Sequence, residues 1–298
     1  MTAHDSATVA TAPDFRSGTL PAALGVVSFS LSFPATVWAL DGFGPWTATG
    51  VRGLLAGLLA ALCLRLARVP VPAREHWPAL LTVAGGCVVG FPLLTTLALR
   101  VSTTAHSAVV VGLLPLATAV FSSALTGRRP SRAFWAAAGT GALAVLAFTL
   151  HHSGGLPTLG DLYLFAALLV CAAGYAQGGR LAAHMPGWQV IGWGVVAALP
   201  VSALVTALAL PVEPVHPSGR ALAGMAYIAA VSQFGGFVVW YRGMAVVGVP
   251  RASQLQLAQP LLTIGWAVLL MGERLSPLAP LTALVVLGCI AVTQRART

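Results

Sequence analysis

Ten apolar stretches, each close to twenty residues long, dominate this chain and restrict what it can fold into. A helix needs about 20 apolar residues to cross a bilayer, and a bilayer cannot satisfy exposed backbone amides, so such stretches must be helices. The chain is 57% hydrophobic and only 8% charged, against about 25% charged residues in soluble domains. We therefore predict an all-α integral membrane protein with ten transmembrane helices, at residues 19–40, 46–67, 78–98, 103–125, 133–150, 159–180, 188–209, 220–241, 250–271 and 277–294.

The basic residues are all arginines, and they gather at alternate ends of the predicted spans. With the N-terminus inside, twelve arginines lie in cytoplasmic segments and three, Arg100, Arg220 and Arg274, lie outside. The positive-inside rule then places both termini in the cytoplasm. The net charge of +9 forms no basic patch on a soluble face, so it does not indicate nucleic-acid binding. Residues 1–18 are polar, lack the order of a signal peptide, and are predicted to be a cytoplasmic tail.

A repeat relates the two halves of the chain. Shifted by 145 residues, the stretch LQLAQPLLTIGWAVLLMGERL falls on VVGLLPLATAVFSSALTGRRP, so that Pro260 meets Pro115 and Gly272 meets Gly127. Five helices therefore occur twice, and because five is odd, the second copy enters the membrane from the opposite side. We predict two inverted repeats, at residues 19–150 and 151–298. Secondary transporters use this construction and bind substrate near the midplane between the copies.

Several stretches resemble the drug/metabolite transporter superfamily, specifically its ten-helix EamA-type transporters. The stretch ATGVRGLLAGLLAALCLRL is similar to the second helix of that family, GDLYLFAALLVCAAGYA to the sixth, and QPLLTIGWAVLLMGERLS to the ninth. The first copy departs from the family pattern, because Gly127-Arg128 stands where Gly-Glu is usual. The resemblance implies a multi-pass transporter of the bacterial inner membrane that moves small organic metabolites, commonly outward.

Arg52 is the most informative charged residue, because it lies about 10 Å inside the second span at 1.5 Å per residue. An arginine in a bilayer costs at least about 2.5 kcal/mol, so it should face the protein interior or a water-filled cavity. There its guanidinium could bind a substrate carboxylate through two hydrogen bonds. Alternatively, Arg52 extends outward to the interface or bonds to helix carbonyls.

Aromatic and amide side chains from other spans are candidates for the lining of a substrate pocket. They are Phe33, Trp38, Tyr175, Gln177, Tyr227, Gln233, Trp240, Gln256 and Gln259. Each aromatic has an alternative reading, since Trp and Tyr also form interfacial belts or pack in the core.

Three prolines interrupt apolar spans and are candidate flexing points beside the substrate path: Pro34, Pro115 and Pro260. The alternative is that each is a packing kink whose freed carbonyls are satisfied by neighbouring helices. Coupling to an ion, if there is any, would use His106 or Glu273 at the outer rim. Glu273 has a second reading as the partner of a local arginine. The acidic residues and the histidines otherwise fall at span ends or in loops, so no carboxylate is expected in mid-membrane.

The sequence contains no recognisable set of catalytic residues. The sequence has no Gly-x-Ser-x-Gly elbow, HExxH motif or phosphate loop, and its four cysteines stand singly inside apolar runs, so neither a catalytic centre, a metal site nor a cofactor is expected. We expect an alternating-access exporter of a small polar metabolite, such as an amino acid or a related compound. The alternatives are a passive channel or a membrane scaffold, and a hydrolase comes third. A homodimer is left open.

Overall fold

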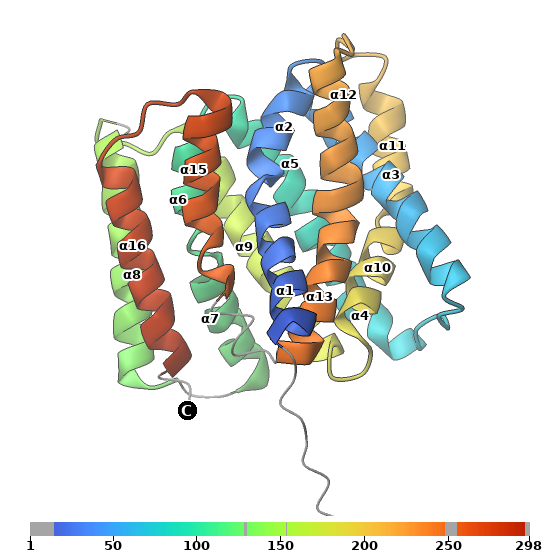
Figure 1. Ribbon diagram of the computed structural model, residues 1–298, viewed down its shortest axis with the longest axis horizontal. Coiled ribbons are helices and arrows are strands. Elements are labelled where there is room, and N and C mark those ends of the chain that lie inside the picture. The colour runs from blue at the N-terminus through green and yellow to red at the C-terminus, as the bar shows by residue number, and fades with distance from the viewer. Residues whose placement is uncertain (1–14, 128–129, 153, 248–254, 296–298) are drawn as a thin grey trace, which may run out of the picture.

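The computed structural model describes residues 15–127, 130–152, 154–247 and 255–295, and these fold into a bundle of membrane-spanning helices (Figure 1). Seven helical stretches are long and apolar enough to cross a membrane, and an eighth results if α10 and α11, which meet at 43°, form one bent span. Two shorter apolar helices complete the set. In chain order, the spans are α1 (Phe15–Ser30) with α2 (Ser32–Leu40); α3 (Pro45–Leu66); η1 (Arg74–His76), α4 (Trp77–Val83), the π-helix η2 (Ala84–Gly90) and α5 (Phe91–Leu99); α6 (Thr104–Val111) with α7 (Leu114–Thr126); α8 (Arg132–His152); α9 (Leu159–Leu181); α10 (Gly187–Ala197) with α11 (Leu199–Ala209); α12 (Gly219–Ala226), the π-helix η3 (Tyr227–Gly235) and α13 (Gly236–Val247); α15 (Gln259–Met271); and α16 (Leu278–Arg295).

The first helix begins and the last helix ends at the same face of the bundle, which is the lower face in Figure 1 and is called the termini face below. The opposite face is called the outer face. Helix α1 begins at Phe15, four residues before the predicted start of the first span, and most of the predicted tail lies outside the described residues. The prediction of an all-α membrane protein with ten spans is confirmed.

The packing partners of the helices show that the two halves are inverted copies. The first span packs on the eighth, through α1 with α13 and α2 with α12, and the sixth span, α9, packs on the third, through α4, η2 and α5. Exchanging the two repeats turns one of these pairings into the other. The second span packs on the seventh (α3 with α11) and the fifth on the tenth (α8 with α16), as a two-fold relation in the membrane plane requires.

Local backbone features repeat with the same symmetry. The third and eighth spans each contain a π-helix, η2 and η3. The fourth and ninth spans each end on a left-handed glycine, Gly127 with φ of 65° and Gly272 with φ of 66°. Such a glycine ends a helix at little cost because it has no Cβ. Gly127 and Gly272 therefore mark equivalent helix ends in the two repeats.

The three prolines lie at helix starts rather than in helix interiors. The first span breaks at Leu31, and Pro34 falls in the first turn of α2. Pro115 and Pro260 likewise lie in the first turns of α7 and α15, after turns in the chain. Proline is tolerated there because its missing N–H has no partner within the helix in any case. Each of the three spans is interrupted, as expected, but the interruption lies just before the proline, and the helix is not kinked at the proline itself.

Leucines that face outward show which surface contacts lipid. On α3, Leu55, Leu58, Leu62 and Leu66 share one face and are 45–73% exposed. The opposite face of the same helix is rich in glycine, and there Gly50 lies against Thr206 of α11. Small residues let membrane helices approach closely, whereas exposed leucines in such numbers are typical of a surface covered by lipid.

Candidate functional site

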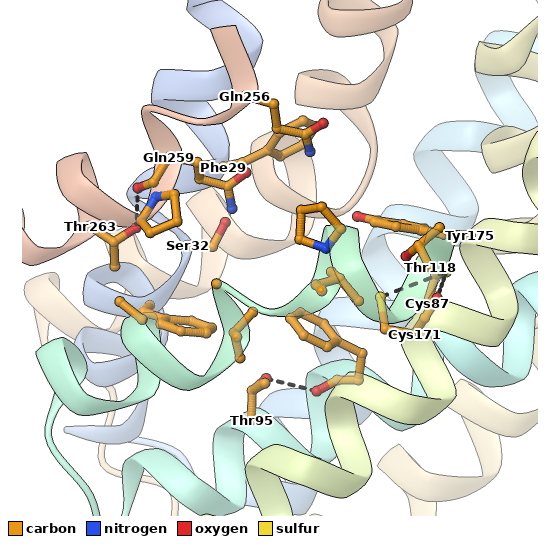
Figure 2. A pocket seen from close by; sticks show the side chains of 18 of the residues that line it. Phe29, Ser32, Cys87, Thr95, Thr118, Cys171, Tyr175, Gln256, Gln259 and Thr263 are labelled. Atoms are coloured by element: carbon orange, nitrogen blue, oxygen red, sulfur yellow. Dashed lines mark hydrogen bonds between the residues drawn. The ribbon is translucent and has the colours of Figure 1, made fainter. Parts of the chain in front are cut away.

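A cavity of about 460 Å³ lies between the two repeats (Figure 2). Spans one to four contribute to it from the first repeat, and spans six, eight, nine and ten from the second. Its lining includes five aromatic side chains, Phe29, Phe33, Phe91, Tyr175 and Phe237. Among the residues that the structure describes, the lining has one charged side chain, that of Arg52, and no carboxylate.

The cavity extends from the middle of the bundle toward the termini face. Ser122 near the end of α7, Gly179 near the end of α9 and Thr293 near the end of α16 all line it, and all three helices end at that face (Figure 1). The structure therefore shows the cavity reaching one side of the membrane bundle.

Arg52 is held at the cavity wall by side chains of the second repeat. It is 7% exposed. Its Nε donates to Oε1 of Gln233 at 2.6 Å, and Nη2 donates to Oγ of Ser232 at 3.1 Å. The Ser232 hydroxyl in turn lies 2.7 Å from the hydroxyl of Ser32. Spans one, two and eight thus meet in one polar cluster around a buried cation.

The two π-helices bring polar and sulfur groups to the cavity. Gln233 belongs to η3, and Cys87 belongs to η2; the Gln233 amide lies 3.5 Å from the Cys87 carbonyl oxygen. The thiols of Cys87 and Cys171 lie 4.0 Å apart, and both residues line the cavity (Figure 2). Extra residues in π-turns re-aim side chains and are frequent at functional sites.

In the sequence, the four cysteines stand singly in apolar runs, and nothing in their spacing indicated that two of them meet. The run AGGCVVG contains three glycines inside an apolar span, and this was the available signal for an irregular helix.

The breaks in the fourth and ninth spans also reach the cavity. Pro115 and Pro260 line it together with Gln256 and Gln259. Just beyond the second break, Thr263 Oγ1 donates to the Ser30 carbonyl at 3.0 Å. That carbonyl lies at the end of α1, so the breaks in the first and ninth spans are bonded to each other.

The structure brings together six of the ten predicted pocket residues. These are Phe33, Arg52, Tyr175, Gln233, Gln256 and Gln259. Phe29, Phe91 and Phe237 also line the cavity and were missed, because a phenylalanine in an apolar span gives no signal that separates a cavity from the core or from lipid.

The other four predicted residues do not line the cavity. Trp38 lies under Arg220 at the outer face, 5.5 Å from its guanidinium carbon. The Tyr227 hydroxyl donates to the Ser28 carbonyl at 2.9 Å. Gln177 accepts from Arg180 near the termini face. Trp240 is 6% exposed and packs in an apolar cluster beside α1. Pro34 of α2 is also absent from the lining.

Acidic side chains tie the two repeats together at the outer face. Glu273 accepts from the backbone N–H groups of Thr104 and Ala105 at 2.7 and 2.9 Å, so a residue after α15 caps helix α6. In the same way Glu213, beyond α11, accepts from the N–H of Thr47 in α3 at 2.7 Å. Glu273 was expected to couple transport or to bind an arginine, and its observed contacts are with helix amides.

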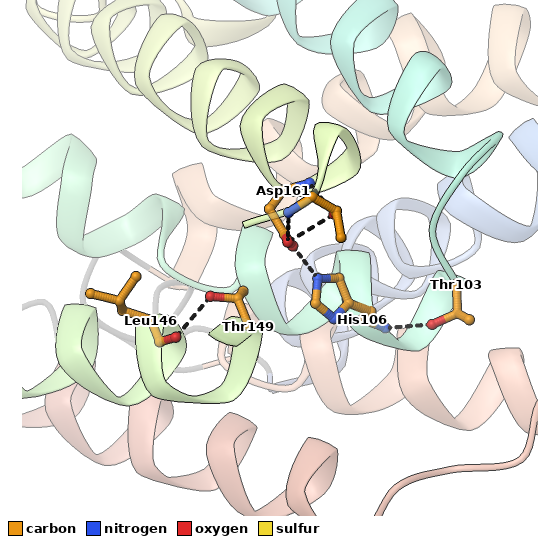
Figure 3. A network of polar contacts seen from close by, with 6 residues as sticks. Thr103, His106, Leu146, Thr149 and Asp161 are labelled. Atoms are coloured by element: carbon orange, nitrogen blue, oxygen red, sulfur yellow. Dashed lines mark hydrogen bonds and ion pairs between the residues drawn. The ribbon is translucent and has the colours of Figure 1, made fainter. Parts of the chain in front are cut away.

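His106 and Asp161 form a buried pair at this same end (Figure 3). The His106 Nε2 lies 2.6 Å from Asp161 Oδ1, and the two side chains are 3% and 0% exposed. From the sequence, both residues were expected at span ends, and neither their burial nor their contact was predicted. Both arise because the first turns of α6 and α9 pack against each other and exclude water.

No set of three potential metal-ligating side chains meets anywhere in the described part of the chain.

Comparison with known proteins agrees with the fold and the repeat. The EamA-like transporter family matches residues 16–150 and again residues 158–294. The "Uncharacterized transporter YdeK" of Bacillus subtilis (strain 168) is 40% identical over 272 residues, which cover 91% of this chain and 95% of that protein. A protein of known crystal structure with 24% identity superposes with a TM-score of 0.66 over 93% of this chain and 98% of its own, which shows the shared fold alone. The resemblance that the sequence motifs carried is confirmed, and this chain belongs to the EamA-like transporter family.

Proposed function

We propose that this protein is an alternating-access carrier that exports a small organic metabolite bearing a carboxylate, such as an amino acid or a related compound. The observation that carries the proposal is the cavity between two inverted repeats with a buried arginine in its wall. We further propose that the protein resides in the bacterial inner membrane with both termini in the cytoplasm, as the arginine distribution indicates.

The chemistry of the cavity favours an anionic group on the substrate. Arg52 is bound to neutral oxygens of Gln233 and Ser232, and none of the described residues that line the cavity carries a carboxylate. A buried cation with no opposite charge is costly, and a substrate carboxylate would offset that cost while forming charge-assisted hydrogen bonds. The surrounding amides and hydroxyls can accept from a substrate ammonium group, and the five aromatic side chains can contact an apolar substrate body.

The size and openness of the cavity fit a carrier. Its volume of about 460 Å³ lies within the range of about 300–1,000 Å³ that is typical of small-molecule sites. It extends to the termini face, whereas contacts between the repeats join the outer ends of the helices. In alternating access, the two repeats rock about a central site, and the breaks at Pro115 and Pro260 are the places where the spans can bend.

Counterflow in proteoliposomes tests the proposal. Vesicles loaded with an unlabelled amino acid should accumulate the labelled compound transiently, because a carrier exchanges substrate in both directions. Three compounds that share the same aromatic or aliphatic skeleton should be compared: the amino acid, the corresponding 2-oxo acid and the corresponding amine. We expect exchange of the first, competition by the second and no effect of the third.

Two variants localise the site. Arg52→Gln should abolish exchange while the protein stays monodisperse in detergent. Arg65→Gln, a change of an exposed arginine at the end of α3, should leave exchange unchanged. A flux that rises linearly with the gradient and shows no exchange would indicate a channel, and no flux for any compound would favour a scaffold. Either result would overturn the proposal.

A further inference from the structure

We propose that His106 and Asp161 form a proton-binding site that holds the outer end of the transporter closed when it is protonated. This inference rests on the alternating-access function proposed above, but it concerns different residues, which lie outside the lining of the central cavity.

The position of the pair is the first part of the argument. His106 belongs to α6 of the first repeat, and Asp161 belongs to α9 of the second. Their 2.6 Å contact therefore joins the two halves at the outer face. Three residues of the first turn of α6 are held in this way, because Glu273 binds the N–H groups of the two residues before His106. A movement that opens the outer end by parting α6 from α9 must separate these groups.

The hydrogen bonds of the pair determine where a proton can bind. Oδ2 of Asp161 accepts from the backbone N–H and from the hydroxyl of Thr158, both at 2.8 Å, as part of a capping box on α9. A carboxylate that accepts at Oδ2 and faces the imidazole with Oδ1 favours a hydrogen on His106 Nε2, which donates to it. A second proton then binds at Nδ1 and converts the neutral ring into an imidazolium.

Protonation strengthens this contact. An imidazolium adds a positive charge that faces the Asp161 carboxylate at 2.6 Å, and the attraction between opposite charges is larger where water is excluded. With a neutral imidazole, the buried Asp161 carboxylate has a weaker partner. By linkage, a proton that binds the closed pair more tightly than the open pair shifts the population toward the closed pair. Acid on the outer side should therefore stabilise the state whose cavity reaches the termini face.

Few other ionisable groups lie on the elements that pack against α6. Near the outer face these groups are Tyr163 of α9, Glu273 and the exposed Arg274 after α15, the exposed Arg100 after α5, and the exposed His151 near the end of α8. Asp41, after α2, is paired with Arg220. Helix α16 carries Cys289 in its middle and Arg295 at the termini face. His106 is thus the histidine of this described set that is buried at the junction, and histidine is the side-chain type that ordinarily changes charge near neutral pH.

Accessibility of the cavity to a thiol reagent gives the test. Ser122→Cys places a thiol in the cavity lining near the termini face, and the protein is reconstituted in proteoliposomes. A membrane-impermeant maleimide is added outside the vesicles at constant pH 7. It therefore labels only those molecules whose termini face lies on the external side of the vesicle membrane. The pH inside the vesicles, which bathes the outer face of those molecules, is set to 6 or 8. The labelling of the unsubstituted protein is subtracted.

We expect labelling at internal pH 6 to be at least about fivefold faster than at pH 8, the low end of typical coupling between linked sites. His106→Gln keeps a hydrogen-bond donor but cannot become a cation, so its two rates should be equal. His216→Gln changes an exposed histidine at the same face and should respond like the parent protein. Asp161→Asn, used also if His106→Gln is not monodisperse, should abolish the response.

Equal rates in the parent protein would overturn the proton site, whatever the variants do, and so would a full response in His106→Gln. Counterflow in the same vesicles separates this failure from failure of the carrier. Exchange without a pH response removes the proton site alone, whereas the absence of exchange removes the alternating-access function on which it rests.

Discussion

Replacement of Glu273 by alanine should destabilise the protein, because this side chain caps helix α6 from the other repeat. Its two carboxylate oxygens accept from Thr104 and Ala105 at 2.7 and 2.9 Å. Loss of a helix cap costs about 0.5–2 kcal/mol, and loss of a negative charge from a helix N-terminus costs about 0.3–1 kcal/mol more. The expected loss for Glu273→Ala is therefore about 1–3 kcal/mol.

Glu273→Gln separates the two contributions. The glutamine amide oxygen can still accept one of the two hydrogen bonds, but it carries no charge, so we expect about half the effect of alanine. Glu75→Gln is the matched control, because the Glu75 side chain is 79% exposed and pairs only loosely, at 3.8 Å, with the neighbouring His76. Exposed pairs of this kind contribute little, and this variant should match the parent.

Thermal unfolding in detergent, followed by the loss of the monodisperse peak in size-exclusion chromatography, measures the effect. For chains of 150–250 residues, 1 kcal/mol corresponds to a shift of about 2–4 °C, so Glu273→Ala should lower the midpoint by about 2–12 °C. A midpoint equal to that of the parent would refute the capping argument. Equal losses for Glu273→Gln and Glu75→Gln would show that charge alone, rather than this contact, is responsible.

Three further predictions follow from the packing. Gly86→Ala should lower stability by about 1–3 kcal/mol, because a Cβ there meets the Val170 carbonyl oxygen. Gly85→Ala should be neutral or stabilising, because nothing lies within 4 Å of a Cβ at that position. The same unfolding assay distinguishes the two variants, and equal midpoints would contradict the packing. Pro260→Ala should change stability by less than about 1 kcal/mol, since Pro260 lies in the first turn of α15. The same variant should slow counterflow if the ninth span bends at this break. Pro78→Ala, in the first turn of α4 and outside the cavity lining, should leave counterflow unchanged. Mercuric ion, which binds thiol pairs, should inhibit counterflow through Cys87 and Cys171, whose sulfurs are 4.0 Å apart; inhibition that persists in the double alanine variant would refute this assignment.

The fold could be predicted from the sequence because each membrane span requires a local run of apolar residues that the sequence shows directly. Apolar runs of about twenty residues define spans, and the positions of Pro115, Pro260, Gly127 and Gly272 repeat because the same helix ends were copied. Arg52 was also found from the sequence, since a charge inside a span must face protein or water. Its neighbours Gln233 and Ser232, about 180 residues away in the chain, were harder to assign. The amide was a candidate but the hydroxyl was not, because serine is common in ordinary membrane helices.

Position along a span did not reveal packing. His106 and Asp161 lie near the ends of their spans, as expected from the sequence, but nothing in the sequence indicated that they are buried or that they meet. Burial at such a position depends on which helix end packs beside it, and for Asp161 that neighbour is α6 of the other repeat. Trp38 and Tyr227 were placed in the pocket for a similar reason, because an aromatic residue can face the cavity, the core or the interface with the same sequence pattern.

The sequence by itself determined the ten spans, their alternation, the inverted copies and the presence of a cation inside the bilayer, because each follows from hydrophobicity and charge along one local stretch. Only the tertiary structure decided which side chains share the cavity, that Cys87 meets Cys171, and that Glu273 and the His106–Asp161 pair join the two repeats at the outer face. Those contacts depend on the rotation of each helix about its axis and on its neighbours across the repeat interface, and apolar spans that bury nearly every face carry almost no periodic signal for either.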